Sequence, residues 1–499
     1  MGFQKLLITG VWRPGVFFSL MLLVSGAFGG TSPVAGRAGF SVKLDGREVP
    51  VFEHWAGGRL NCAYAHFTVT KAVPVEVVVD SEVREWSLSP ARHELVVVAT
   101  TNSLRFKLPT PLYLVLTVNN VRMLLLADPP EPPLPAATIL DVTSAPFSAD
   151  ATGTKDATAS LQRALDKAGE LGNGAIVHFP PGRYTTTGLR VKSRTEVHLA
   201  SGALLQGSTR VEDYPEYQRA PDLPRVGCLL RVMDAEGVHI FGHGTLDAKG
   251  LAFVGDATDI RNVKFKTRCL TISNSSRVVV EGLICRESTS WSVPFYNSTD
   301  VTARRLKVIN DLGPLKHSDG INLCAVRNGT VEDCFVHTTD DAYCAKGHEG
   351  GPSENLVFRR LIALSATRGL KCGMQAYEPM RKVLFEQVDV VQTRDGMDLM
   401  HQDGFGEWSD IIFRDVRVEK CGRNGIMGSI RDGGNIRNVR FEDVIFQEAR
   451  PGFLLGKNAT NRIEGVIFSN LVMGGKLVTN LDQSGIEING SAGKIRFTK

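Results

Sequence analysis

The sequence predicts an all-β protein, a right-handed parallel β-helix (solenoid) preceded by a small N-terminal β-sandwich. Three observations support this prediction. A phenylalanine-centred unit recurs with a period in the twenties, short strand-like runs replace long helical patterns, and 50 glycines supply the turns of such a chain. Hydrophobic residues make up 43% and charged residues 22% of the 499, which excludes a disordered chain and a membrane bundle.

Residues 1–30 are expected to form a secretory signal. Lys5 and Arg13 precede the apolar run 16–23, and mostly small residues follow at 25–30. This order is typical of an export signal. The alternative is a transmembrane anchor, but the run is shorter than the roughly 20 residues that a span requires. We therefore expect a secreted or periplasmic protein without membrane attachment once the signal is removed.

Residues 36–128 are expected to form the sandwich. Short strand-like runs are separated by turns rich in Asp, Asn, Ser and Pro, and no helical period appears, which is typical of antiparallel sheets. The runs are residues 75–79, 95–99, 104–108, 112–118 and 121–126. The proline-rich stretch after Asp128 indicates a stiff linker over 129–139. The β-helix domain is then predicted at 140–499.

One amphipathic helix is predicted, over residues 159–171, because five apolar residues from Leu161 to Leu171 share one face. Asp156 or Thr158 is the candidate N-cap residue, and Asn173-Gly174 ends the pattern. A strand is predicted at 175–179. We expect this helix to cap the first end of the solenoid.

The rest of the chain repeats a unit of the form Val-x-Phe-x-x-Val. Its phenylalanines are 27, 28, 28 and 27 residues apart, and Val280, Ala303 and Val331 take the same place in earlier units. Helical repeats are excluded because no unit contains an amphipathic helix. One coil cannot bury its apolar face alone, so stacked coils share a continuous core. The predicted internal ladder contains Phe358, Phe385, Phe413, Phe441 and Phe468.

Charge and cysteine content exclude several kinds of function. Lys and Arg total 57 against 53 Asp and Glu, a net charge of +4, which is too small for a nucleic-acid-binding protein. The nine cysteines are odd in number and form no CxxC pair, so a zinc site is not expected. Most should be buried free thiols, and the sequence defines no pairing. We expect no metal, no cofactor and a monomer.

A second strand start recurs about ten residues after each phenylalanine-like position. The third residue of each segment is apolar and should point inward, and by the period of two its fourth residue should point outward. The segments are 319–322, 341–344, 368–371, 395–398 and 424–427. Asp319, Asp341, Arg368 and Asp395 should therefore stack along one outer edge of the solenoid, with Asn322, Lys371 and Asp398 beside them and Asp340 adjoining.

Three acids on neighbouring coils suit the hydrolysis of a glycosidic bond with inversion. That reaction needs a protonated carboxyl at the leaving oxygen and a carboxylate that holds water across the ring. Close like charges raise the pKa of one acid and so keep it protonated near neutral pH. An isolated Asp-Gly is usually only a turn, but Asp319 and Asp340-Asp341 fall in register on adjacent coils.

These motifs resemble those of the clan that joins polygalacturonases (glycoside hydrolase family 28) with dextranases and isopullulanases (family 49). The resemblance runs from about residue 140 to about 450 and includes the segments 153–158 and 180–184 around the helix. The N-terminal sandwich is similar to the family 49 layout. The clan has a lone Asp and, about one coil on, an Asp-Asp pair. The resemblance implies that Asp340 is the general acid and that Asp319 and Asp341 activate water.

The sequence departs from the polygalacturonase pattern at two places. A Gly-His-Gly motif is replaced by Thr367-Arg368-Gly369, and an Arg-Ile-Lys motif that grips the substrate carboxylate is replaced by Asp398-Leu399-Met400. Both changes favour an α-linked glucan of dextran type as the carbohydrate polymer. Arg368, Lys371 and Lys346 leave an acidic or galactose-containing glycan as the alternative.

Further side chains are candidates for carbohydrate contact. Trp291 precedes the acids by one coil, and Trp408 and His401 belong to a longer turn beside the predicted groove. His317 and His337 are candidates to orient the acids by hydrogen bonding. The simpler alternative for the tryptophans is packing against the coil.

Two other kinds of protein remain as alternatives to a hydrolase. A polysaccharide lyase needs a base and a group that neutralises a uronate carboxylate, often calcium, Arg or Lys, and the acid triplet fits hydrolysis better. In a non-catalytic β-helical adhesin or glycan-binding protein, the aspartates would be turn residues.

Overall fold

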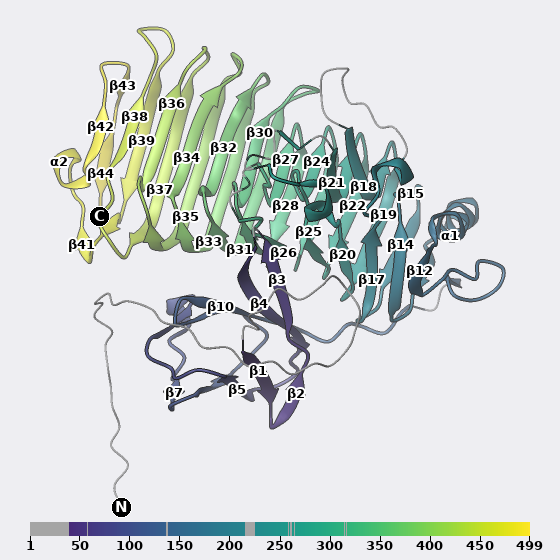
Figure 1. The fold of residues 1–499 in the computed structure, drawn as a ribbon. Coiled ribbons are helices and arrows are strands. Elements are labelled where there is room, and N and C mark those ends of the chain that lie inside the picture. Colours follow the sequence, from purple (N-terminus) through teal and green to yellow (C-terminus); the bar gives the residue numbers. More distant parts are fainter. Residues whose placement is uncertain are drawn as a thin grey trace, which may run out of the picture.

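The computed structural model describes residues 39–56, 58–135, 138–214, 225–257, 259, 262–263, 265–313, 315 and 317–499. The expected signal at 1–30 lies outside the described residues. Figure 1 shows a long stack of coils with a smaller N-terminal body against its side. No helix in the described part of the chain has the length and apolar character needed to cross a membrane.

The N-terminal body consists of two five-stranded sheets, which share one cluster of buried apolar side chains. Their pairings are antiparallel except between β10 and β4, which run parallel. The first sheet contains β2 (Arg47–Val49), β1 (Phe40–Leu44), β5 (Val73–Val79), β8 (Ser103–Leu108) and β7 (Val98–Ala99). The second contains β3 (Phe52–Ala56), β4 (Arg59–Thr68), β10 (Val121–Asp128), β9 (Tyr113–Val118) and β6 (Trp86–Ser89).

The stack of coils is built from two long sheets of almost entirely parallel strands, counted over the described residues. The smaller sheet, which carries the candidate site, contains β15 (Leu189–Val191), β18 (Arg225–Met233), β21 (Phe265–Ser273), β24 (Val293–Tyr296), β27 (Ile321–Cys324), β30 (Tyr343–Gly347), β32 (Arg368–Ala376), β34 (Asp395–Gln402), β36 (Ile426–Ile430), β38 (Gly452–Leu455) and β42 (Ile486–Ile488).

The larger sheet wraps the remaining sides of each coil. It contains β11 (Ile139–Asp141), β12 (Thr152–Asp156), β13 (Ala175–Phe179), β14 (Gly182–Thr186), β16 (Thr195–Leu199), β17 (Ala203–Gly207), β19 (Glu236–Gly242), β20 (Thr245–Asp247), β22 (Ser276–Glu281), β23 (Ile284–Arg286), β25 (Thr299–Arg304), β26 (Lys307–Asn310), β28 (Arg327–Glu332), β29 (Phe335–Thr338), β31 (Ser353–Ser365), β33 (Met380–Thr393), β35 (Trp408–Cys421), β37 (Ile436–Phe446), β39 (Ile463–Ser469), β40 (Val472–Met473), β41 (Lys476–Leu477), β43 (Ala492–Gly493) and β44 (Arg496–Thr498).

The helix α1 (Thr158–Leu171) packs on the first coils, as predicted, and buries Leu161 and Leu165 in the solenoid core. Leu171, expected on the same buried face, is 43% exposed because the helix ends there, where Gly172 takes a positive φ of 60°. A short helix, α2 (Leu481–Ser484), lies in the last coils, and single 3₁₀ turns occur at Ala91–His93, Val211–Asp213 and Gly250–Phe253.

The predicted phenylalanine ladder is confirmed. Successive rings stack with centroids 4.6, 5.0, 5.1 and 5.0 Å apart, and Phe497 continues the row at 4.8 Å. Val280, Ala303 and Val331 pair in the same register on the preceding coils. The nine cysteines are free and buried, as expected for most of them.

The N-terminal sheets pack against the side of the solenoid through an apolar contact. Cys62, Tyr64, Val115, Leu124 and Leu126 form one cluster with side chains from five successive coils. The solenoid side chains are Ile284, Ile309, Phe335, Ile362, Leu364 and Val391. Burial of apolar area in this contact favours a fixed position of the sheets on the coils.

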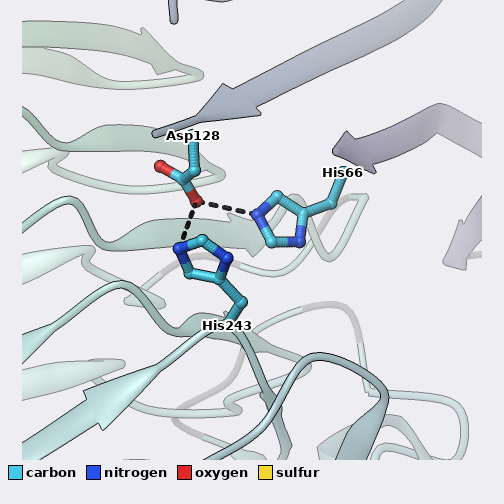
Figure 2. Close-up of side chains that lie close together, drawn as sticks. All are labelled: His66, Asp128 and His243. Atoms are coloured by element: carbon cyan, nitrogen blue, oxygen red, sulfur yellow. Dashed lines mark hydrogen bonds and ion pairs between the residues drawn. The ribbon is translucent and has the colours of Figure 1, made fainter. Parts of the chain in front are cut away.

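A polar seam lies beside this apolar contact. Figure 2 shows Asp128, the last residue of β10, between His66 of β4 and His243 of the solenoid. Asp128 Oδ2 is 2.7 Å from His66 Nε2 and 3.8 Å from His243 Nε2. The fully buried Lys307 donates to the same carboxylate, and Tyr113 donates to its other oxygen. Burial favours the protonated acid, but Lys307 and His66 outweigh it and hold the pKa of Asp128 well below its usual range.

Candidate active site

The three candidate acids lie on the turns that lead into two neighbouring strands of the smaller solenoid sheet. Asp319 precedes β27, and Asp340 and Asp341 precede β30. The predicted register is confirmed, because Ile321 pairs with Tyr343, which in turn pairs with Leu370. Backbone hydrogen bonds continue across the turns, since the N–H of Gly320 donates to the carbonyl of Asp341 at 2.9 Å. The turn acids are therefore held in a stack by the coil-to-coil ladder.

The surroundings of Asp340 favour the protonated form of its carboxyl. Thr367 Oγ1 donates to its Oδ1 at 2.7 Å, and the backbone N–H of His317 donates to its Oδ2 at 2.5 Å. Burial and then the negative charges of Asp341 and Asp319 raise the pKa of Asp340 to about 7. This carboxyl can keep its proton near neutral pH.

The surroundings of Asp341 favour the ionised form of its carboxyl. Its Oδ2 accepts a hydrogen bond from Lys371 Nζ at 2.7 Å, and its Oδ1 lies 3.7 Å from an Arg368 nitrogen. Burial alone would favour the neutral acid, but the Lys371 and Arg368 charges outweigh it and hold the pKa of Asp341 well below its usual range. A proton acceptor therefore lies next to a proton donor.

Asp319 completes the triplet from the preceding coil. Asn322 Nδ2 donates to its Oδ2 at 2.9 Å, and Lys346 Nζ lies 3.5 Å from the same oxygen. Burial raises the pKa of Asp319, and the Lys346 charge opposes this increase. Carboxylate oxygens of Asp319 and Asp341 lie within 4.8 Å of each other. Since a water hydrogen bond is about 2.8 Å long, one water can contact both.

Basic side chains surround the acids, and the two lysines among them, Lys346 and Lys371, are buried. Lys346 Nζ lies 4.6 Å from the Trp291 ring centroid and donates to the Gly373 carbonyl at 3.2 Å. Arg368 Nε lies 3.1 Å from Asp398 Oδ2. Burial raises the pKa of Asp398 to about 6 against the neighbouring positive charges.

Two groups of described residues bring metal-ligating atoms together: Asp319 with Asp341 and Cys344, and His66 with Asp128 and His243. In both groups a lysine ammonium already pairs with the aspartates: Lys346 and Lys371 in the first, Lys307 in the second. The chain itself supplies the positive charge that these carboxylates require. Neither group therefore needs an ion for charge balance.

Two of the predicted carbohydrate contacts are wrong. Trp408 is fully buried in the solenoid core, and His401 is fully buried beneath it with Nε2 2.6 Å from the Gly406 carbonyl. Both side chains point inward for a reason visible in the sequence. Alternate residues of a strand point to the same face, and His401 follows the inward-pointing Met397 and Leu399 in this alternation. Trp408 pairs with the buried Met380 of the previous coil.

The two histidines expected to orient the acids act differently. The ring of His317 lies near Asp259, at 3.6 Å, and only its backbone N–H reaches Asp340. The His337 ring lies 3.2 Å from the carboxylate of Asp311, away from the triplet. Asn322, Lys346, Arg368, Lys371, Asp398 and Trp291 do gather around the acids.

Sequence reasoning missed one side chain that contacts two of the acids. The Thr367 hydroxyl lies 2.7 Å from Asp340 and 3.1 Å from Asp341. Its signal was its position, directly before the aligned Arg368 and one coil after Asp340.

Comparison with known proteins shows which proteins this chain resembles. Residues 186–430 match the family model described as Glycosyl hydrolases family 28. A probable polygalacturonase from Vitis vinifera is 21% identical over 349 residues, which cover 63% of this chain and 70% of that protein. The three acids lie within this match, and over about half of its length the chain is similar to family 28 of the glycoside hydrolases. It is therefore a glycoside hydrolase, and it spans 54% and 38% of the lengths of the next two curated relatives.

Solved structures agree with the clan's fold. A hyperthermoactive exopolygalacturonase from Thermotoga maritima has a TM-score of 0.56 at 17% identity and covers 74% of this chain and 93% of its own. Dex49A from Penicillium minioluteum has a TM-score of 0.59 at 13% identity and covers 92% of this chain and 94% of its own. The second match includes most of the described N-terminal body as well as the solenoid.

Proposed function

We propose that this glycoside hydrolase cleaves an acidic polysaccharide with inversion, with Asp340 as the general acid and Asp319 and Asp341 holding the attacking water. The observation that supports this proposal is the pair of opposite protonation states on adjacent residues. The pKa of Asp340 is raised to about 7, whereas the Lys371 charge lowers the pKa of Asp341 and favours its ionised form. Inversion requires both a donor and an acceptor for protons in one site.

The choice of an acidic polymer rests on the charge around the triplet. Five basic side chains contact four acids: Lys346, Lys371, Arg368, Arg394 and Arg423 contact Asp319, Asp341, Asp398 and Asp395. The fifth acid, Asp340, is largely protonated below about pH 7. A uronate carboxylate would balance the positive charge that remains. The match to family 28 supports the same substrate class.

This choice reverses the preference that the sequence departures suggested. Asp398 does stand where polygalacturonases hold Arg, but Lys371 pairs with it in register one coil earlier. The basic group is thus displaced by about 4.8 Å along the stack. An α-linked glucan of dextran type remains the second candidate, because Asp398 and Met400 are not basic and the Dex49A structure covers 92% of the chain.

A polysaccharide panel with an NMR record of the product anomer tests the function. Polygalacturonate should be cleaved faster than dextran, and the first product should have the inverted configuration. Cleavage of dextran with little cleavage of polygalacturonate would select the second candidate. Retention of configuration would contradict the proposed roles of the three aspartates.

Binding without cleavage of any polymer would favour a glycan-binding protein. The same panel therefore also separates the enzyme from the adhesin alternative.

A further inference from the structure

We propose that the β3–β4 hairpin of the N-terminal sheets is a positioning element of the active site, in which His54 and Asn61 hold the start of the segment that carries Asp319. The inference rests on the proposed roles of Asp319 and Asp340. It assigns a function to the N-terminal body, which otherwise lies beside the solenoid. Figure 1 shows β3 and β4 reaching the coils near β26 and β31.

The hairpin reaches one backbone carbonyl with two donors. His54 Nε2 and Asn61 Nδ2 each lie 2.8 Å from the carbonyl oxygen of Asp311, and both side chains are buried. Burial lowers the pKa of His54 to about 4, so the imidazole is neutral at neutral pH. Its Nε2 then carries the proton, because a carbonyl only accepts. Both bonds join residues more than 200 positions apart in the chain.

Asp311 begins the segment that leads to the acids. It follows directly after β26, and its own carboxylate lies 3.2 Å from His337 and accepts from the Gly313 N–H at 3.0 Å. Leu312 and Leu315 are buried against Val263. Arg122 of β10 adds a second approach from the N-terminal sheets, 3.9 Å from the Asp311 carboxylate. The start of the segment is therefore fixed by groups from both parts of the molecule.

The far end of the segment supplies the catalytic groups. Within the described residues, His317 donates its backbone N–H to Asp340, and Asp319 follows two positions later. His317 has a positive φ of 67°, a conformation that needs support from its surroundings. A shift of Asp311 would displace His317 and with it the hydrogen bond to the Asp340 carboxyl, while the ladder bonds of Asp319 to Ser292 and of Gly320 to Asp341 remain. Misplacement of reacting groups by about 1 Å can cost about 10²-fold in rate.

The test compares two histidines of the same hairpin that both reach the solenoid. The positioning variants are His54→Leu and the double change of His54 and Asn61 to Leu, and His54→Gln keeps a donor as the conservative variant. His66→Leu is the matched control, because His66 contacts Asp128 in the seam rather than Asp311. All variants are made in the full chain.

Hydrogen–deuterium exchange gives a readout that does not depend on activity. Peptides that cover residues 310–319 should exchange faster in His54→Leu and in the double variant, and as in the unmodified protein in His54→Gln and His66→Leu. Unchanged exchange in the double variant would overturn the inference, whatever the substrate is.

Kinetics on polygalacturonate or dextran, whichever the unmodified protein cleaves, give the second readout. The double variant should lose about 10- to 100-fold in kcat with little change in KM. The alkaline limb of its pH–rate profile should move to higher pH, because the lost His317 N–H bond no longer favours the ionised Asp340 carboxylate. The charged neighbours Asp341, Asp319 and Lys371 stay in place. A kcat and pH profile equal to those of His66→Leu would overturn the catalytic part. If Asp340→Asn itself remains active, the proposed function fails, and exchange alone decides whether the hairpin holds the segment.

Discussion

At the residue scale, the chemistry depends on one acid that keeps its proton beside one that loses it. We expect Asp340→Asn and Asp319→Asn each to lower kcat by about 10²–10⁴-fold with little change in substrate affinity, because Asn keeps the shape without the proton transfer. Initial rates on the cleaved polymer measure this effect. Substrates with a good leaving group should rescue Asp340→Asn more than Asp319→Asn, because only the first variant lacks leaving-group protonation.

The matched control is Asp300→Asn, an exposed aspartate near the start of β25 that accepts from Asn328 at 2.9 Å. It should keep full activity. Near-normal rates in either catalytic variant would identify Asp319 and Asp340 as structural residues without a catalytic role.

The pH profile follows from the same acid. Since Asp340 must be protonated and its pKa is about 7, kcat/KM should fall as the pH rises through about 7. The Thr367 hydroxyl favours the ionised form, so Thr367→Val should raise this pKa and move the alkaline limb to higher pH. Rates across a pH series measure the shift. Thr393→Val is the control, because Thr393 donates to backbone carbonyls only, and a shift of equal size there would contradict the argument.

At the element scale, the phenylalanine ladder is the repeated unit of stability. Phe413 is fully buried between Phe385 and Phe441, at 5.0 and 5.1 Å, so Phe413→Ala should destabilise the fold by about 3–5 kcal/mol. Denaturant unfolding measures this loss. Phe405→Ala is the control, because Phe405 is 75% exposed and should change stability little. Equal effects would mean that the ladder contributes no more than a surface ring.

Much of the stacking of the solenoid coils could be predicted from the sequence because the repeat is strict. The interval between phenylalanines sets the coil length, and the alternation of side chains then aligns Asp341, Arg368 and Asp395, which are 27 residues apart. Asp319 lies only 22 residues before Asp341, so its alignment depends on the residue pattern of the strand start rather than on the phenylalanine interval. The same alternation of side chains, applied to His401, would have placed its ring in the solenoid core. The β3 and β4 strands could not be predicted in this way, since their contact with Asp311 joins distant segments through two single hydrogen bonds.

At the scale of the whole molecule, the seam at Asp128 makes the attachment of the N-terminal sheets sensitive to pH. Burial lowers the pKa of His243 from 6.5 to about 4, so the unfolded chain binds a proton more readily than the folded one between these values. This contribution is present above about pH 6.5 and is lost as the pH falls towards about 4. Thermal unfolding across this range should show a smaller dependence on pH in His243→Gln.

The control for this prediction is the unmodified protein, measured over the same pH range. A slope in His243→Gln equal to that of the control would show that the seam does not titrate.

The breadth of the contact between the N-terminal sheets and the coils limits how such chains can change in length. The sheets touch the coils in succession from Ile284 to Val391, and Ser89 also contacts Glu419 of β35. An extra coil inserted within this span would displace every later contact by about 4.8 Å and separate the two surfaces. Within the described residues, the coils after β35 carry none of these contacts. Coils after β35 can therefore be gained or lost without displacing the contact, whereas the contact fixes the number of coils beneath the N-terminal sheets.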